Sequence, residues 1–226
     1  WQAPGNDGMP LVFSQEIIPQ TLDASDFEIT SANGTTYSVD DVTLLPANEE
    51  FELRTVLLIG DYGNYPNNEP VEVKIVGDLM SRSDQNHKNQ TVVVTPLAEG
   101  PFLSYAEYFS FDDDYPYVEK GRACDCPKYE TEVVVRTVWA GGVRALNGEE
   151  LGENELDRFT VTLVHNHDTM HVKPFMLGDL NDNDNNIDLC MRERGVPVWI
   201  QVEENTAIDP RGDKNPTTQI DVKSRW

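Results

Sequence analysis

The segment GDLNDNDNNIDLC (178–190) places four aspartates among four asparagines. Carboxylate and amide oxygens are the hard ligands that calcium prefers, and it takes roughly six to eight of them. Carboxylates this close together repel one another unless a cation neutralises them. The EF-hand pattern is not met, because the sixth-position glycine and the terminal glutamate are missing in every register. We therefore predict a calcium loop, with a solvated turn as the alternative. The predicted ligands are Asp179, Asp182, Asp184 and Asp188.

A calcium ion in this loop would stabilise the fold rather than catalyse a reaction. The loop aligns with LLPANEEFELR (44–54), a connection between equivalent strands in the first half of the chain. No paired nucleophile and base lie near it in the sequence. We expect the ion to stiffen a surface connection.

The second candidate site is VHNHDTMHV (164–172), which holds three of the four histidines of the chain. Imidazole is a common ligand of copper and zinc, and a neighbouring methionine favours copper(I). A hairpin can bring two of these histidines into cross-strand proximity. The alternative is a polar hairpin tip that binds no metal. The candidate ligands are His165, His167, Met170 and His171.

The chain has three cysteines, Cys124, Cys126 and Cys190, so one disulfide and one spare thiol can form within it. We predict a disulfide from the Cys124/Cys126 pair to Cys190. Zinc ligation by Cys124 and Cys126 is the alternative, although their spacing is tighter than the usual two-residue gap.

Motifs for catalysis are missing from the sequence. It contains no serine elbow, zinc-protease helix, phosphate loop or dinucleotide fingerprint. Acidic residues are so abundant that a glycosidase carboxylate pair cannot be assigned from sequence. We expect a non-catalytic protein and keep a polysaccharide-active enzyme as an alternative.

Composition narrows the classes of partner. Seventeen basic and forty acidic residues give a formal net charge of −23, which repels nucleic acid and anionic lipid. The longest apolar run, 56–59, is far shorter than the roughly 20 residues of a membrane span. The chain starts at Trp1 without a methionine, and we interpret it as a mature secreted or surface-exposed protein. The expected partner is a surface protein or a carbohydrate.

The pattern of elements is all-β. DFEITSANGTTYSVDDVTLL (26–45) alternates around Asn33-Gly34, a strong hairpin signal. FEITSANGTTYSV (27–39) aligns with FTVTLVHNHDTMHV (159–172), and 70–94 aligns with 197–222. We therefore predict two tandem β-sandwich units from an internal repeat. The predicted parts are a first sandwich (10–98), an aromatic and acidic connector with Cys-x-Cys (99–130) and a second sandwich (131–226).

The stretch LVFSQEIIPQTLDASDFEITSANGTTYSVDDVTLL (11–45) resembles bacterial-type immunoglobulin-like repeats, in which a first strand precedes a DFxVT…NG hairpin. Such repeats are typically stalks, spacers or adhesive modules of surface and secreted proteins. The resemblance implies a binding or scaffolding role and supplies no catalytic residues. The aromatic connector, the Cys-x-Cys pair and the histidine-rich hairpin are not part of that pattern.

Overall fold

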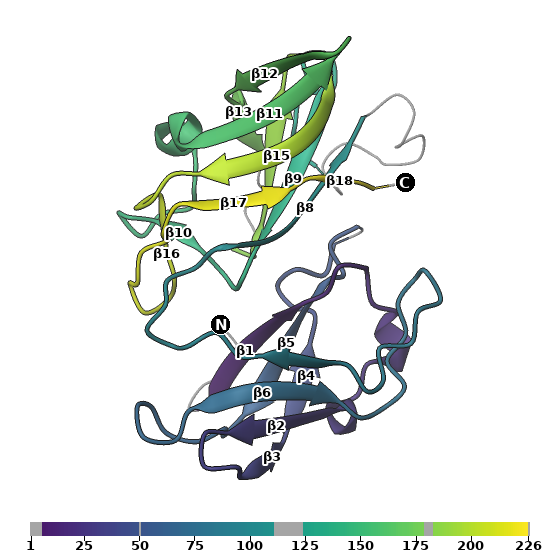
Figure 1. Ribbon diagram of the computed structural model, residues 1–226, viewed down its shortest axis with the longest axis vertical. Coiled ribbons are helices and arrows are strands. Elements are labelled where there is room, and N and C mark those ends of the chain that lie inside the picture. Colours follow the sequence, from purple (N-terminus) through teal and green to yellow (C-terminus); the bar gives the residue numbers. More distant parts are fainter. Residues whose placement is uncertain (1–5, 50, 111–123, 179–182, 226) are drawn as a thin grey trace. The chain divides into compact units, whose positions relative to one another are not determined.

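The computed structural model describes residues 6–49, 51–110, 124–178 and 183–225. It divides into unit 1 (Trp1–Glu99) and unit 2 (Gly100–Trp226), and both consist of β-strands with short 3-10 helices (Figure 1). Within the described ranges, no helix has the length and apolar character needed to cross a membrane. The chain is therefore all-β, as its sequence predicts.

Unit 1 contains two antiparallel sheets. One has the order β1-β5-β4 and the other the order β3-β2-β6-β7. The strands are β1 (Asp7–Val12), β2 (Phe27–Ser31), β3 (Thr36–Ser38), β4 (Asp41–Thr43), β5 (Thr55–Gly60), β6 (Pro70–Ile75) and β7 (Thr91–Val93), with the 3-10 helices η1 (Pro19–Thr21) and η2 (Ala24–Asp26).

One core joins the two sheets of unit 1. Alternate residues of β2 and β6, such as Ile29 and Val73, pack with Val56 and Leu58 of β5 in a single buried cluster. Because successive side chains of a strand point to opposite faces, each sheet turns one apolar face to this core. The arrangement is that of a β-sandwich.

Unit 2 contains a four-stranded sheet, β12-β11-β15-β17, and a five-stranded sheet, β13-β14-β9-β8-β18. The small sheet β10-β16 completes it. The elements are β8 (Leu103–Phe109), β9 (Val133–Trp139), β10 (Arg144–Ala145), η3 (Glu153–Arg158), β11 (Phe159–His165), β12 (Asp168–Val172), β13 (Met176–Gly178), β14 (Asn186–Met191), β15 (Val196–Val202), β16 (Ala207–Ile208), β17 (Thr218–Asp221) and β18 (Lys223–Ser224).

The core of unit 2 again lies between two sheets. Val161 and Ile200 of the four-stranded sheet share a buried cluster with Val135, Ile187 and Leu189 of the five-stranded sheet. All neighbouring strands in these two sheets are antiparallel except β18 and β8, which are parallel.

The strand orders of the two units correspond. The hairpin β2–β3, followed by β6 and β7, gives the order β3-β2-β6-β7, and the hairpin β11–β12, followed by β15 and β17, gives β12-β11-β15-β17. In the other sheet, β1-β5-β4 has the order of β9-β14-β13, to which unit 2 adds β8 and β18. The two hairpins predicted at 27–39 and 159–172 are confirmed.

The structure differs from the sequence interpretation in the stretch 99–130. Residues Leu103–Phe109 form strand β8, which pairs with β9 inside the five-stranded sheet of unit 2. Phe109 and Leu103 are buried, on opposite faces of that sheet. The first part of the predicted connector is therefore a structural strand of unit 2.

Candidate functional site

A row of four buried charges crosses the outward face of the five-stranded sheet, on the side away from the core. Asp188 of β14 lies opposite Arg136 of β9, and Arg136 lies opposite Glu107 of β8. Arg136 donates from Nε and from a terminal nitrogen to the two carboxylate oxygens of Asp188, each at 2.8 Å. Arg225 donates to Oε1 of Glu107 at 2.6 Å. We call these four residues the charge ladder.

The charge ladder is almost completely excluded from solvent. Side-chain exposure is 1% for Arg136 and 6% for Asp188, and 3% for Arg225 and 1% for Glu107. The guanidinium of Arg136 also lies 5.7 Å from the ring centroid of Phe109. Two acids and two arginines cancel in charge, which is the condition under which ions tolerate burial. The bidentate contact between Arg136 and Asp188 gives the ladder a role in fixing the register of β9 against β14.

The disulfide lies on the same outward face. Cys126 is bonded to Cys190 of β14, and Cys124 is a buried free thiol. Of the predicted cysteine trio, the structure therefore selects Cys126 as the partner of Cys190. A Cβ at Gly178 would lie 3.3 Å from the backbone nitrogen of Cys126 and 3.4 Å from the Cβ of Asp188. Glycine thus allows the segment around Cys126 to lie close over β13 and β14.

Cys124 extends this cluster. The sulfur of Cys124 accepts a hydrogen bond from the backbone N–H of Cys126 at 3.3 Å. Burial raises the pKa of the Cys124 thiol well above its usual range; nearby Asp188 raises it further and Arg136 lowers it. A thiol kept protonated in this way is a poor nucleophile and a poor metal ligand. The geometry gives the two cysteines of the Cys-x-Cys motif different roles.

The predicted calcium loop is described only in part. Asp179 and Asp182 lie outside the described residues. Asp184 is buried and accepts hydrogen bonds from the backbone N–H and the side-chain amide of Asn186, each at 2.6 Å. Asp188 belongs to the charge ladder, where a calcium ion would be repelled by the Arg136 guanidinium. The structure thus places Asp184 and Asp188 in different environments, with different partners.

Asn186 offers a further oxygen at this point. Its side-chain Oδ1 is buried, and it has no hydrogen-bond partner among residues 6–49, 51–110, 124–178 and 183–225. A buried acceptor without a partner is costly. From sequence, the asparagine oxygens of this loop were counted as suitable for calcium but only aspartates were named as ligands, whereas the start of β14 buries Asn186 next to Asp184.

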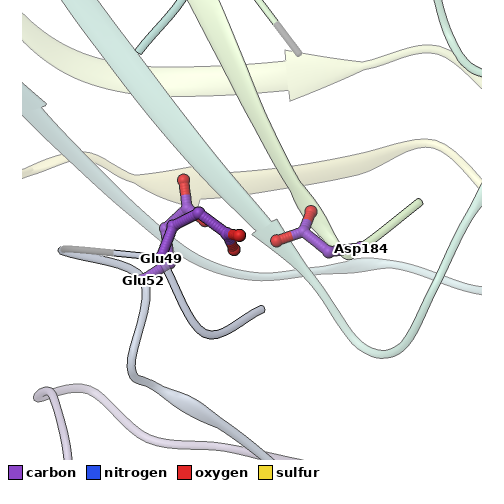
Figure 2. A group of neighbouring side chains, drawn as sticks. All are labelled: Glu49, Glu52 and Asp184. Atoms are coloured by element: carbon purple, nitrogen blue, oxygen red, sulfur yellow. The ribbon is translucent and has the colours of Figure 1, made fainter. Parts of the chain in front are cut away.

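Acidic residues also occur in the equivalent connection of unit 1. Glu49 and Glu52 lie between β4 and β5, and Asp184 lies between β13 and β14. Figure 2 draws these three side chains as sticks. These connections correspond because β4–β5 and β13–β14 hold the same places in their sheets. Glu52 is buried, and Glu49 accepts the backbone N–H of Asn48 at 3.1 Å. Both units therefore carry acidic side chains at one point of their topology.

The histidine hairpin does not gather its candidate ligands on one face. Asn166 and His167 form its turn with φ values of 50° and 72°. His171 lies opposite Thr162, whereas His165 lies opposite Asp168, and the odd spacing along β11 puts the two histidines on opposite faces. Met170 packs against the core of unit 2. This register corrects the expectation of cross-strand proximity between the histidines.

Sequence reasoning missed the charge ladder, although one signal was available. Arg136 is the one charged residue of the strand VVVRTVW (133–139), and a charge in a strand buried on both faces requires a buried partner. Its partner Asp188 is 52 residues away and was grouped with the aspartates next to it in the sequence. No protein family, curated protein or solved structure matches the chain.

Proposed function

We propose that this chain is a secreted or surface-exposed, non-catalytic protein with a binding, adhesive or scaffolding role. It would consist of two immunoglobulin-like β-sandwich units that arose from an internal repeat. The observation that carries the proposal is the shared strand order of the two units, β3-β2-β6-β7 with β1-β5-β4 and β12-β11-β15-β17 with β13-β14-β9. Tandem modules of one topology are a common way to build stalks and adhesive surfaces.

The disulfide supports an extracellular setting. Cys126–Cys190 joins the segment before β9 to β14, and disulfides persist mainly in oxidising compartments. The net charge of −23 bears on the partner instead, because it repels anionic surfaces.

Calcium remains part of the proposal, with a revised set of ligands. Asp184 and the unpartnered Oδ1 of Asn186 are buried oxygen donors side by side at the start of β14, and both suit a hard cation. Asp188 leaves the set because it serves Arg136. An ion held here would tie the β13–β14 connection to β14, the strand that carries Asp188 of the charge ladder.

The binding role is tested by displaying the full chain on bacterial cells. Adhesion to immobilised glycans and extracellular-matrix proteins is measured against cells that display an unrelated β-sandwich. We expect adhesion to at least one surface above that control. Adhesion to none of them would refute the binding role.

The calcium part needs a separate measurement on the purified chain. Thermal unfolding is compared in CaCl₂ and in chelator, with Asp184→Asn as the variant and Asp168→Asn, in an exposed strand, as the control. Saturation about 100-fold above the Kd should raise the unfolding free energy by about 2.7 kcal/mol. Asp184→Asn should lose most of that gain and Asp168→Asn should keep it. Identical melting of the wild type in both solutions would refute the calcium loop.

A further inference from the structure

The outward face of the four-stranded sheet in unit 2 carries an exposed tryptophan among uncharged polar side chains. β15 alternates, so that Ile200 and Val202 enter the core while Trp199 and Gln201 point away from it. Trp199 is 48% exposed, an unusual position for so large an apolar side chain. We call the central part of this surface the Trp199 face; its residues are Thr162, His171, Trp199, Gln201, Gln219 and Asp221. Thr160, opposite Gln201, and the exposed Val196 lie at its margins.

The register of the sheet sets these residues in two rows. Thr162 lies opposite His171 on one side and opposite Trp199 on the other, and Trp199 lies opposite Asp221. The Thr162 hydroxyl and Nδ1 of His171 are 3.0 Å apart. Directly opposed residues share a face and have Cβ atoms about 5 Å apart. Thr162 itself is buried, so the exposed hydrogen-bonding side chains nearest the indole are His171, beyond Thr162, and Asp221 on the other side.

The second row adds two amides. Gln201 lies opposite Gln219, and both side chains are exposed. Gln201 is two residues from Trp199 on the same strand, which places it roughly 7 Å along the face. Each amide offers donors and an acceptor, so each can match a hydroxyl group that both donates and accepts.

The Trp199 face is close to neutral on a strongly acidic chain. The chain has a net charge of −23, whereas Asp221 is the one carboxylate of this face. That carboxylate lies 3.5 Å from the ammonium of Lys223. A cationic partner would be drawn to other, more acidic surfaces, and an anionic one would be repelled by the chain as a whole. An uncharged, hydrogen-bonding partner fits this face best.

We infer that the Trp199 face binds a neutral polysaccharide, with the indole of Trp199 packing against the C–H face of a sugar ring. The hydroxyls of the sugar would bond to the exposed side chains of His171, Gln201 and Gln219, while the buried Thr162 holds His171 in place. This inference rests on the binding role proposed above and names its ligand class. A protein partner is disfavoured, since a stable protein interface needs about 1,000 Å² with an apolar centre. Trp199 is the one exposed aromatic of this face.

Unit 1 provides a built-in comparison. Glu72 of β6 lies opposite Thr30 of β2, as Trp199 of β15 lies opposite Thr162 of β11. The sequence alignment of Pro70 with Pro197 gives the same correspondence. A carboxylate at this position gives a sugar ring no apolar platform. The inference therefore assigns binding to unit 2 alone.

The test is native affinity electrophoresis of the full chain in gels that contain hydroxyethylcellulose, xylan or galactomannan. We expect at least one polymer to retard the wild type. Trp199→Ala should weaken that binding at least about tenfold, and Trp199→Tyr should keep part of it. Gln201→Ala should have a smaller effect, about threefold. Glu72→Ala, the matched change in unit 1, should behave as the wild type.

Three results would overturn the inference. They are the absence of retardation by all three polymers, equal retardation of Trp199→Ala and wild type, and Trp199-dependent self-association in sedimentation, which would assign the face to a second copy of the chain. The display assay separates this inference from the proposed function. Adhesion in the display assay that survives Trp199→Ala, together with no retardation in the gels, would retain the binding role and refute the polysaccharide site.

Discussion

The two units build one strand order with different chemistry. In unit 1, an outward pair between β1 and β5 is Pro10 opposite Leu57. In unit 2, an outward pair between the corresponding strands β9 and β14 is Arg136 opposite Asp188. An apolar pair tolerates small shifts, whereas a buried ion pair requires both partners in place. Strand order alone therefore does not determine which contacts stabilise a β-sandwich.

The largest expected effect breaks the charge ladder. Arg136→Met leaves Asp188 buried without its partner and should lower the unfolding free energy of unit 2 by about 3–5 kcal/mol. The double change Arg136→Met with Asp188→Leu imitates the pair of unit 1 and should restore most of the loss. Hydrogen exchange in denaturant, followed by peptide mass spectrometry, reports on each unit separately.

Arg158→Met is the control for this prediction. Arg158 pairs with Glu203 at 2.8 Å, but both side chains are about half exposed, at 50% and 45%. Surface pairs contribute about 1 kcal/mol or less. If Arg136→Met cost no more than Arg158→Met, the ladder would not be a main stabilising element of unit 2.

The next effect concerns the disulfide, since all three cysteines of the chain lie in unit 2. Cys126 and Cys190 are 64 residues apart, so the bond restricts a long stretch of the unfolded chain. Replacing both by serine should destabilise unit 2 by about 2–4 kcal/mol and leave unit 1 unchanged. Urea denaturation with and without reductant measures the difference. Cys124→Ala keeps the disulfide and should remain sensitive to reductant; insensitivity of the wild type would contradict the prediction.

Local signals in the sequence were sufficient for the hairpins. Asn33-Gly34 predicted the turn between β2 and β3, where Gly34 has φ of 83°, a conformation that glycine adopts without strain. The second predicted hairpin is also present, because the turn at Asn166 and His167 joins β11 to β12. Such turns depend on residues adjacent in sequence, which is why sequence reasoning finds them.

The candidate site was less predictable, because its contacts join distant parts of the chain. Asp188 stands four residues from Asp184 in sequence, yet β14 carries it to Arg136 on β9. The exact register of β11 and β12 decides which histidines share a face, and a shift of one residue would reverse the answer. The sequence showed that acidic residues and histidines were clustered along the chain, but strand pairing across the sheet determined which residues they contact.

A smaller effect distinguishes the units at alkaline pH. The pKa of the Cys124 thiol is raised by burial, so the folded state keeps its proton longer than the unfolded chain. The resulting stabilisation is complete below the unfolded pKa of about 8.5 and is lost as the pH rises above it toward the folded value. Unit 2 should lose up to about 1.4 kcal/mol per pH unit there.

Unit 1 should respond at a higher pH. Burial, and then the charges of Asp40 and Asp7, raise the pKa of Tyr62, so its stabilisation is lost only above about pH 10. Urea denaturation between pH 8 and 11, followed separately for each unit, measures how the unfolding free energy of each unit falls with pH. Cys124→Ala should remove the earlier slope and Tyr62→Phe the later one. An unchanged slope in Cys124→Ala would show that another group causes it.

The smallest effect on stability concerns the sheet edges. Phe13 N–H donates to the Arg54 carbonyl at 2.8 Å. Backbone groups of β1 point alternately toward β5 and away from it, so the nitrogen of Pro10 faces the edge of β1 that β5 does not pair. Proline lacks the N–H that a further strand would need, and this protects an edge. In unit 2, β8 covers the corresponding edge of β9. Pro10→Val should cost less than about 1 kcal/mol but increase concentration-dependent association in sedimentation. Pro210→Val, in an exposed turn, should not. A monomeric Pro10→Val chain at every concentration would show that unit 1 protects this edge by other means.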